Sequence, residues 1–191
     1  MEVMAVTILI TGFEPFGGDT VNPSWEAVEL LPEGVGGHDI RKLRLPVVFG
    51  RCGERLMAEA ERLRPDVVIA CGVAGGRAEV TPELVAVNWR MAALADNAGA
   101  RYDGQPIAPE GADAFMTRLP VNDMVRAMRE AGLPARLSLS AGAYVCNDLY
   151  YALMAAQERM GYRGLFIHVP LLSVLPAGET ARAIACCLRC L

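Results

Sequence analysis

Cys146 has the position of a catalytic nucleophile. It follows the apolar run ARLSLS and the short turn SAG, and it opens a segment with helical spacing of apolar residues. A helix N-terminus presents unpaired backbone N–H groups and a partial positive charge, which lower a thiol pKa and favour the reactive thiolate. The same N–H groups could bind the oxyanion of an attacked carbonyl. The alternative interpretation is a small core residue at a helix end.

His168 is the candidate base for such a thiol. The chain has only two histidines, and His38, after two glycines, is expected in a surface turn. His168 lies in LFIHVP, near the C-terminal end of a predicted buried strand. Catalytic groups of α/β proteins gather beyond the carboxyl ends of strands, so His168 is placed to reach that edge. A structural histidine in a strand is the competing interpretation.

A carboxylate that binds the far imidazole nitrogen would fix the histidine tautomer. Three candidates lie near predicted strand ends, Glu14, Glu79 and Glu83, and their spacing does not choose among them. Glu79 could equally be a solvated charge after a turn. The G-x-x-G-G run at 72–76 is neither a dinucleotide fingerprint nor a P-loop, and it indicates tight passage of the backbone beside a site.

The elements that must position these residues alternate along the chain. Short apolar runs predict strands, and periodic amphipathic segments predict helices, the first of which begins at Asn22-Pro23. The segment 96–119 is rich in glycine and proline and predicts a long ordered loop with one helical turn. Such alternation predicts an α/β fold, a three-layer α/β/α sandwich. Strands are expected at 5–11, 41–46, 67–71, 84–87, 135–140 and 165–169, and further helices at 50–64, 121–131, 146–160 and 178–191.

Composition sets limits on the class of protein. The 191 residues are 53% hydrophobic and 21% charged, which predicts a single domain over 1–191 with a sizeable core. The net charge of -4 argues against a nucleic-acid partner. No signal peptide is visible in residues 1–7 and no run is long enough to span a membrane, so the six cysteines are expected to be reduced in a cytoplasm. Three of them, Cys186, Cys187 and Cys190, are expected to be ordinary thiols on a helix; a metal or redox role is the alternative.

Several separated blocks resemble the pyroglutamyl peptidase I family of cysteine peptidases, also called pyrrolidone-carboxylate peptidases. The blocks occur in the family's order and cover most of the chain. They are TGFEPFGGDTVNPSWEAV at 11–28, LPVVFG at 45–50, AGGRAEVTPELVAVN at 74–88, DN at 96–97, SAGAYVCN at 140–147 and FIHVP at 166–170.

The resemblance implies a fold, a reaction and a set of residues. The fold is an α/β/α sandwich with a central mixed, mostly parallel sheet, in a homo-oligomer that is commonly a tetramer. The reaction is hydrolysis of the amide bond after an N-terminal pyroglutamyl residue, by a thiol protease that needs no metal or organic cofactor. The catalytic set falls on Cys146, His168 and Glu83, so the resemblance decides against Glu79.

The resemblance also implies a substrate pocket. Phe13 and Phe16 would pack against the lactam ring, and Asn22 would help bind it, although Asn22 also suits a helix cap. Val73 stands where family members often have glutamine, and Ala93 where many have arginine, with Arg90 nearby. The chain is also shorter than usual after Pro170. These departures motivate the alternative of a catalytically weakened pyroglutamyl-binding protein on the same scaffold.

Overall fold

A computed structural model describes residues 5–191, and its centre is a six-stranded sheet in the order β2-β3-β1-β4-β10-β5. The four inner strands run parallel, and the two edge strands are antiparallel to their neighbours. The sheet is therefore mixed and mostly parallel, as expected. Its strands are β1 (Thr7–Phe13), β2 (Gly34–Val35), β3 (His38–Leu45), β4 (Val67–Val73), β5 (Thr81–Glu83) and β10 (Arg163–Val169).

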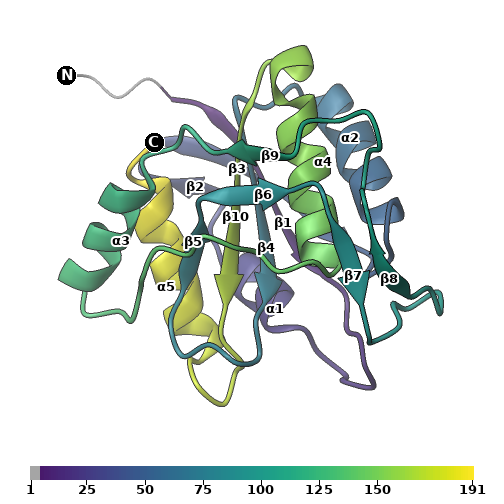
Figure 1. The fold of residues 1–191 in the computed structure, drawn as a ribbon. Helices are drawn as coiled ribbons and strands as arrows, with labels where there is room; N and C mark the ends of the chain where they lie inside the picture. The colour runs from purple at the N-terminus through teal and green to yellow at the C-terminus, as the bar shows by residue number, and fades with distance from the viewer. Residues whose placement is uncertain (1–4) are drawn as a thin grey trace.

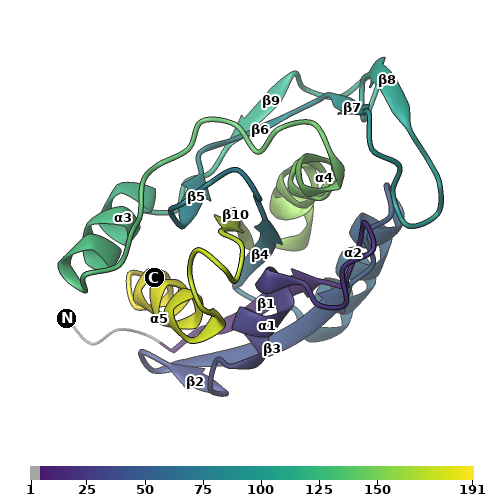
Figure 2. The same cartoon turned by 90° about the horizontal axis from the view of Figure 1, so that it is seen from below.

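Helices cover both faces of this sheet, which makes three layers (Figures 1 and 2). The helices on one face share a core with one set of strand residues, and those on the other face with the alternate set. This division follows from the alternation of side chains along each strand. On the first face lie α1 (Pro23–Glu29), α3 (Val121–Glu130) and α5 (Ala177–Leu188), and on the second α2 (Arg51–Leu63) and α4 (Val145–Met160).

The apolar strand sequences account for the centre of the sheet. In β4, Val67 and Ile69 face the layer of α1, α3 and α5, whereas Val68 and Ala70 face α2 and α4, and all four are fully buried. Continuous apolar runs of this kind are typical of parallel strands that are covered on both faces. No helix in residues 5–191 is long and apolar enough to cross a bilayer.

Local signals set several helix ends. Asn22 caps α1, because its side chain accepts a hydrogen bond from the backbone N–H of Ser24 at 3.1 Å, and Pro23 occupies the first helical position. The helix α4 ends at Gly161, whose φ of 78° is the left-handed conformation common after helices. Both ends agree with the sequence prediction.

Two segments differ from the prediction. The expected helical turn in 96–119 is absent, and the segment instead supplies β8 (Tyr102–Gln105) and β9 (Ala114–Met116), which pair with β7 (Arg90–Ala92) and β6 (Val85–Val87). The segment 135–140 forms no strand; it makes only isolated bridges, Val80 to Ala135 and Glu83 to Ser138. Both outcomes depend on partners distant in sequence, which local patterns do not report.

His38 is buried, so its expected place in a surface turn is wrong. The turn is made by Gly36 and Gly37, both with positive φ, and His38 is already the first residue of β3. Its side chain is on the same side of the strand as Ile40, two residues on, and both are buried. His38 is therefore a structural residue of the β2–β3 hairpin.

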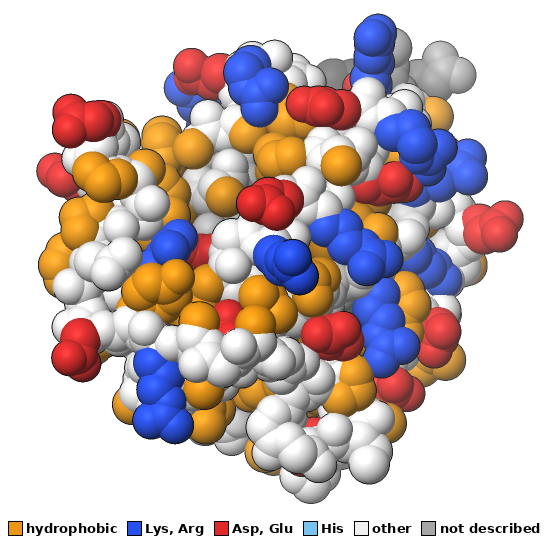
Figure 3. All heavy atoms as spheres, turned by 90° about the vertical axis from the view of Figure 1, so that its right-hand side faces the viewer, with side chains coloured by type: hydrophobic (Ala, Val, Ile, Leu, Met, Phe, Trp, Pro, Cys, Tyr) orange, Lys and Arg blue, Asp and Glu red, His pale blue; other side chains and the backbone are white. Residues whose placement is uncertain are grey.

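Side chains of both signs are interspersed on the face that carries α2, β7 and β8 (Figure 3). Lysine and arginine side chains lie beside acidic ones there, and apolar side chains lie between them. This face therefore has no continuous basic surface of the kind that binds nucleic acid.

Candidate active site

His168 and Glu83 form a buried pair at one edge of the sheet. His168 lies near the end of β10, Glu83 ends β5, and His168 Nδ1 is 2.7 Å from Glu83 Oε1. The residues are 4% and 0% exposed. A carboxylate can only accept, so the imidazole hydrogen is on Nδ1 and Nε2 is left as an acceptor. Glu83 is thus the candidate carboxylate that the structure brings to His168.

Cys146 lies on the same face of the sheet as His168. A Cβ atom at Gly72 would lie 2.8 Å from the Cys146 Sγ, so the sulfur sits directly over Gly72. Gly72 is in turn the register partner of His168 between β4 and β10. The Phe166 ring, which belongs to the core beneath α4, has its centroid 4.8 Å from that of His168. The sulfur and the imidazole therefore stand over adjacent strands.

The first turn of α4 provides free backbone donors at Cys146. The N–H groups of Asn147 and Asp148 donate to the Tyr144 carbonyl, whereas those of Val145 and Cys146 bond to no backbone carbonyl within residues 5–191. Asn147 fixes this turn, because its side chain exchanges hydrogen bonds with the backbone of Val87 at 2.9 and 3.1 Å. Two N–H groups are therefore available to an anion beside the thiol.

Burial opposes ionisation of the thiol. It raises the pKa of Cys146 to about 12, with a further contribution from the negative charge of Glu83; Arg77 and the helix backbone act in the opposite direction. The expectation of a lowered thiol pKa at this helix end is therefore wrong, because desolvation outweighs the helix N-terminus. Cys146 is a neutral thiol at neutral pH.

Burial also keeps His168 neutral. It lowers the pKa of the imidazole below the ordinary 6.5, and it outweighs the hydrogen bond and charge of Glu83, which raise the pKa. At neutral pH the site therefore holds a neutral thiol and a neutral imidazole. This protonation state suits general-base catalysis, in which the proton leaves the thiol as the carbon–sulfur bond forms.

Arg77 is a site residue that the sequence reasoning missed. Its guanidinium donates to Glu83 Oε1 and to Thr81 Oγ1, both at 2.5 Å, and to the Ser140 carbonyl at 2.9 Å. The sequence places Arg77 directly after Gly75-Gly76 and six residues before Glu83, and this proximity was the only signal. No local pattern predicts that the guanidinium contacts the Glu83 carboxylate.

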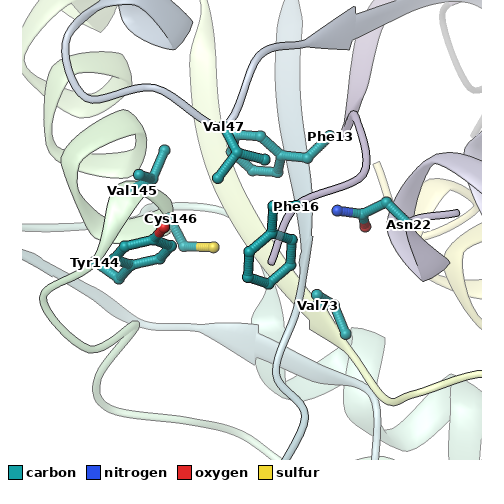
Figure 4. A pocket seen from close by; sticks show the side chains of 8 residues that line it. All are labelled: Phe13, Phe16, Asn22, Val47, Val73, Tyr144, Val145 and Cys146. Carbon is teal, nitrogen blue, oxygen red and sulfur yellow. The ribbon is translucent and has the colours of Figure 1, made fainter. Parts of the chain in front are cut away.

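A small apolar pocket opens beside the sulfur (Figure 4). Figure 4 shows the Cys146 sulfur directed toward the Phe16 ring, with Phe13 and Val47 above that ring in this view. The four residues predicted for substrate binding, Phe13, Phe16, Asn22 and Val73, all line this pocket. The sequence reasoning missed three further lining residues, Val47, Tyr144 and Val145, although two of them lie in the motif that contains Cys146.

Most of the hydrogen-bonding capacity of the Asn22 side chain is already used within the protein. Its Nδ2 donates to the Glu14 carbonyl at 2.9 Å, and its Oδ1 accepts from both the N–H and the hydroxyl of Ser24. Asn22 is therefore a helix cap that also lines the pocket, and one amide hydrogen is left for a ligand.

The remaining candidates lie outside this cluster. Glu14 accepts from the backbone N–H of Val47, and Glu79 pairs with Arg136 at the surface. Arg90 pairs with Asp148 and lies over the ring of Tyr102, and it is not among the residues that line the pocket.

The six cysteines are all free. Cys52, Cys71 and Cys187 are fully buried, and burial raises their pKa values. No group of three or more His, Cys, Asp or Glu side chains in residues 5–191 could hold a metal ion. Cys146 is the cysteine of this chain that combines a helix N-terminus, a pocket and a nearby histidine.

The sequence matches a known family along nearly its whole length. The family model described as pyroglutamyl peptidase matches residues 6–187. A pyrrolidone-carboxylate peptidase of Lactobacillus acidophilus is 45% identical over 167 residues, which are 86% of this chain and 84% of the relative. Pyrrolidone-carboxylate peptidase 1 of Ralstonia nicotianae is 47% identical over 176 residues, 91% of this chain and 82% of the relative.

Solved structures agree with these sequence relatives. The crystal structure of pyroglutamyl peptidase I from Bacillus amyloliquefaciens superposes with a TM-score of 0.91 at 36% identity, over 97% of this chain and 95% of that one. A pyrrolidone carboxyl peptidase from Pyrococcus furiosus gives a TM-score of 0.90 at 31% identity, over 95% of this chain and 96% of that one. The expected fold class, an α/β/α sandwich with a mixed sheet, is confirmed.

Proposed function

Because this chain belongs to the pyroglutamyl peptidase family of cysteine peptidases, we propose that it hydrolyses the amide bond that follows an N-terminal pyroglutamyl residue of a peptide. The observation that carries the proposal is the cluster of Cys146, His168 and Glu83, in which Cys146 also lines an apolar pocket. Glu83 is the only one of the three candidate carboxylates within bonding distance of His168 in residues 5–191.

The first step forms an acyl-enzyme. His168 Nε2 takes the proton of the Cys146 thiol as the sulfur attacks the carbonyl carbon that joins pyroglutamate to the next residue. The carbonyl oxygen becomes an oxyanion, and the free N–H groups of Val145 and Cys146 are placed to bind it. His168 then gives its proton to the leaving amine, and the carbon–nitrogen bond breaks.

The second step releases pyroglutamate. Water attacks the thioester carbon, His168 accepts the water proton, and the proton returns to the Cys146 sulfur as the carbon–sulfur bond breaks. Glu83 keeps the imidazole in one tautomer and stabilises the imidazolium that forms twice in the cycle. No metal ion or organic cofactor takes part in these steps.

The pocket suits an uncharged lactam. The rings of Phe13 and Phe16 and the side chains of Val47 and Val73 offer apolar contacts to a five-membered ring. An ordinary N-terminal residue carries an ammonium group, which would have to lose its hydration in this pocket without a carboxylate partner among the lining residues. The pocket therefore favours pyroglutamate over an ordinary N-terminal residue, because it disfavours the charged ammonium group.

The decisive experiment is release of a fluorophore from a pyroglutamyl amide. We expect turnover by the wild type and a loss of at least about 10³-fold in both Cys146→Ser and Cys146→Ala, because the acyl-enzyme cannot form efficiently without the thiol. Cys186→Ser, at a partly exposed thiol on α5, is the control and should retain full activity. Full activity in either Cys146 variant would remove the nucleophile assignment.

A catalytically weakened binding protein is the second candidate, and Val73 in the pocket wall is the observation that favours it. It predicts that calorimetry detects pyroglutamate binding while the wild type shows no turnover. Robust turnover excludes it.

We also propose a homo-oligomer in the cytoplasm. Trp89, Met91 and Leu94 are 43%, 57% and 54% exposed on one short segment, an apolar surface that suits a subunit contact. The six free cysteines suit a reducing compartment. Light scattering after gel filtration tests the first statement, and a monomer at micromolar concentration would contradict it.

A further inference from the structure

We propose that Arg77 is a positioning residue of this site, which holds the carboxylate of Glu83 and the turn that leads to Cys146 in one fixed arrangement. This inference rests on the proposed roles of Cys146 and His168. It adds a fourth residue, from the connection between β4 and β5, to the three that the motifs indicated.

The contacts of Arg77 join two segments that are distant in sequence. One guanidinium nitrogen, Nη1, donates to Glu83 Oε1 and to Thr81 Oγ1 at 2.5 Å each. The other, Nη2, donates to the Ser140 carbonyl at 2.9 Å, across 63 residues of sequence. The planar, rigid fork of arginine can serve both directions at once, which a lysine ammonium on its flexible stem would do less well.

The turn that Arg77 holds leads directly into the catalytic helix. Ser140 lies six residues before Cys146, and its neighbour Ser138 bridges to Glu83 across the sheet edge. Release of the Ser140 carbonyl would loosen the start of the connection 140–144, which leads into the first turn of α4. Since reacting groups must be held within a fraction of an ångström, such freedom would lower the rate more than it weakens binding.

The positive charge of Arg77 also compensates the buried carboxylate of Glu83. Glu83 is 0% exposed, and a buried carboxylate is costly unless it is paired. Its other partner, His168, is neutral because burial lowers the pKa of the imidazole. Arg77, whose side chain is 20% exposed, is thus the cation that pairs with the buried Glu83 carboxylate beside a neutral histidine.

The charge of Arg77 also acts on the two reacting groups. Glu83 on β5 is bonded to the imidazole, and Arg77 on the β4–β5 connection acts on it by its charge. From α4, Cys146 lies over Gly72, the register partner of His168, and Tyr150 donates to the Glu83 carbonyl. Arg77 lowers the pKa of His168 and also that of Cys146. Its removal therefore raises both pKa values, and the acid limb of the rate profile moves to higher pH whichever group takes up the inhibiting proton.

The test compares Arg77→Met and Arg77→Lys with the wild type, with Arg136→Met as the control from a surface ion pair. For Arg77→Met we expect kcat to fall about 10²-fold with KM changed less than about threefold, and the acid limb of kcat/KM to move up by at least about 0.3 pH unit. Arg77→Lys keeps the charge and should restore the acid limb while kcat stays below that of the wild type. Arg136→Met should match the wild type in every parameter.

A readout without turnover separates this inference from the proposed function. The alkylation rate of Cys146 by iodoacetamide, followed by peptide mass spectrometry, reports the thiolate fraction. At every pH at which the protein is folded, alkylation of Arg77→Met should be slower than that of the wild type, because its thiolate fraction is smaller, even if the wild type has no peptidase activity. A positioning role is overturned if Arg77→Met keeps the acid limb, the alkylation profile and a kcat within twofold of the wild type. If Arg77→Met fails to fold by circular dichroism, Arg77→Lys decides, and an unchanged kcat there overturns the inference.

Discussion

The Cys146 sulfur occupies the space that a side chain at Gly72 would need. A Cβ atom at residue 72 would lie 2.8 Å from Sγ of Cys146 and 2.8 Å from Cζ of Phe166, closer than real Cβ contacts come. The absence of a side chain at residue 72 is therefore what brings the thiol of α4 down onto β4, next to the strand that carries His168. The position of the Cys146 thiol therefore depends on this glycine.

Gly72→Ala should displace the thiol and abolish most of the activity. The methyl group would push Cys146 or Phe166 from its place, and overpacking of a core commonly costs about 1–3 kcal/mol of stability. We expect a loss of about 10²-fold or more in kcat, because an error of about 1 Å in the nucleophile position has that effect. Kinetics and thermal unfolding measure the two effects.

Gly76→Ala is the matched control for that variant. Nothing lies within 4 Å of a Cβ atom at residue 76, so the extra methyl group should be accepted without loss of activity. Equal kinetics for Gly72→Ala and the wild type would show that the thiol can move without consequence, contrary to the structure.

Glu83→Gln should shift the rate profile in the direction opposite to Arg77→Met. Glu83 raises the pKa of His168 and that of Cys146, so removal of its charge lowers both. The acid limb of kcat/KM should therefore move to lower pH, while kcat falls about 10²- to 10⁴-fold because the imidazolium loses its partner. Measurement of kcat/KM against pH for both variants in one buffer series checks that their acid limbs move in opposite directions. Shifts in the same direction would contradict the prediction.

Much of this site could be predicted from the sequence, because short local patterns indicate the helices and strands that carry its residues. The helix start at Asn22-Pro23, the buried strand that carries His168 and the helix that Cys146 opens each follow from neighbours in the chain. Position alone left three carboxylates open, and the family resemblance chose Glu83, the one that the structure places against His168.

The rest depended on contacts that no local pattern reports. Arg77 meets Ser140 across 63 residues, and the strands of 96–119 exist only because β6 and β7 pair with them. The pKa of the thiol was mispredicted for a related reason. The helix N-terminus is visible in the sequence, whereas the burial that outweighs it is a property of the packed fold. Burial of His38 could have been found, since it alternates with the apolar Ile40.

His168 should make the protein less stable in mild acid. Its pKa is lowered from 6.5 by burial in the folded state, so the unfolded chain binds the proton more tightly. The stabilisation is complete above the unfolded pKa of 6.5 and is lost as the pH falls from there toward the folded pKa. Urea unfolding of the wild type and His168→Gln at pH 7.5 and pH 5.5 tests the sign. The wild type should lose more free energy of unfolding than the variant; an equal loss would mean that His168 is not buried in the neutral form.

Val73→Gln should improve substrate binding if the pocket lacks a polar partner for the lactam. Val73 lines the pocket at the C-terminal end of β4, half-buried, where an amide side chain could reach the lactam N–H or C=O. A hydrogen bond made equally in the ground state and the transition state lowers KM and leaves kcat nearly unchanged. A net gain of about 0.5–1.5 kcal/mol per hydrogen bond corresponds to a KM lowered roughly two- to tenfold. Val73→Leu is the control, because it adds bulk without a polar group and should raise KM by narrowing the pocket. A KM for Val73→Gln that rises as much as that of Val73→Leu would mean that size, not polarity, limits binding at this wall.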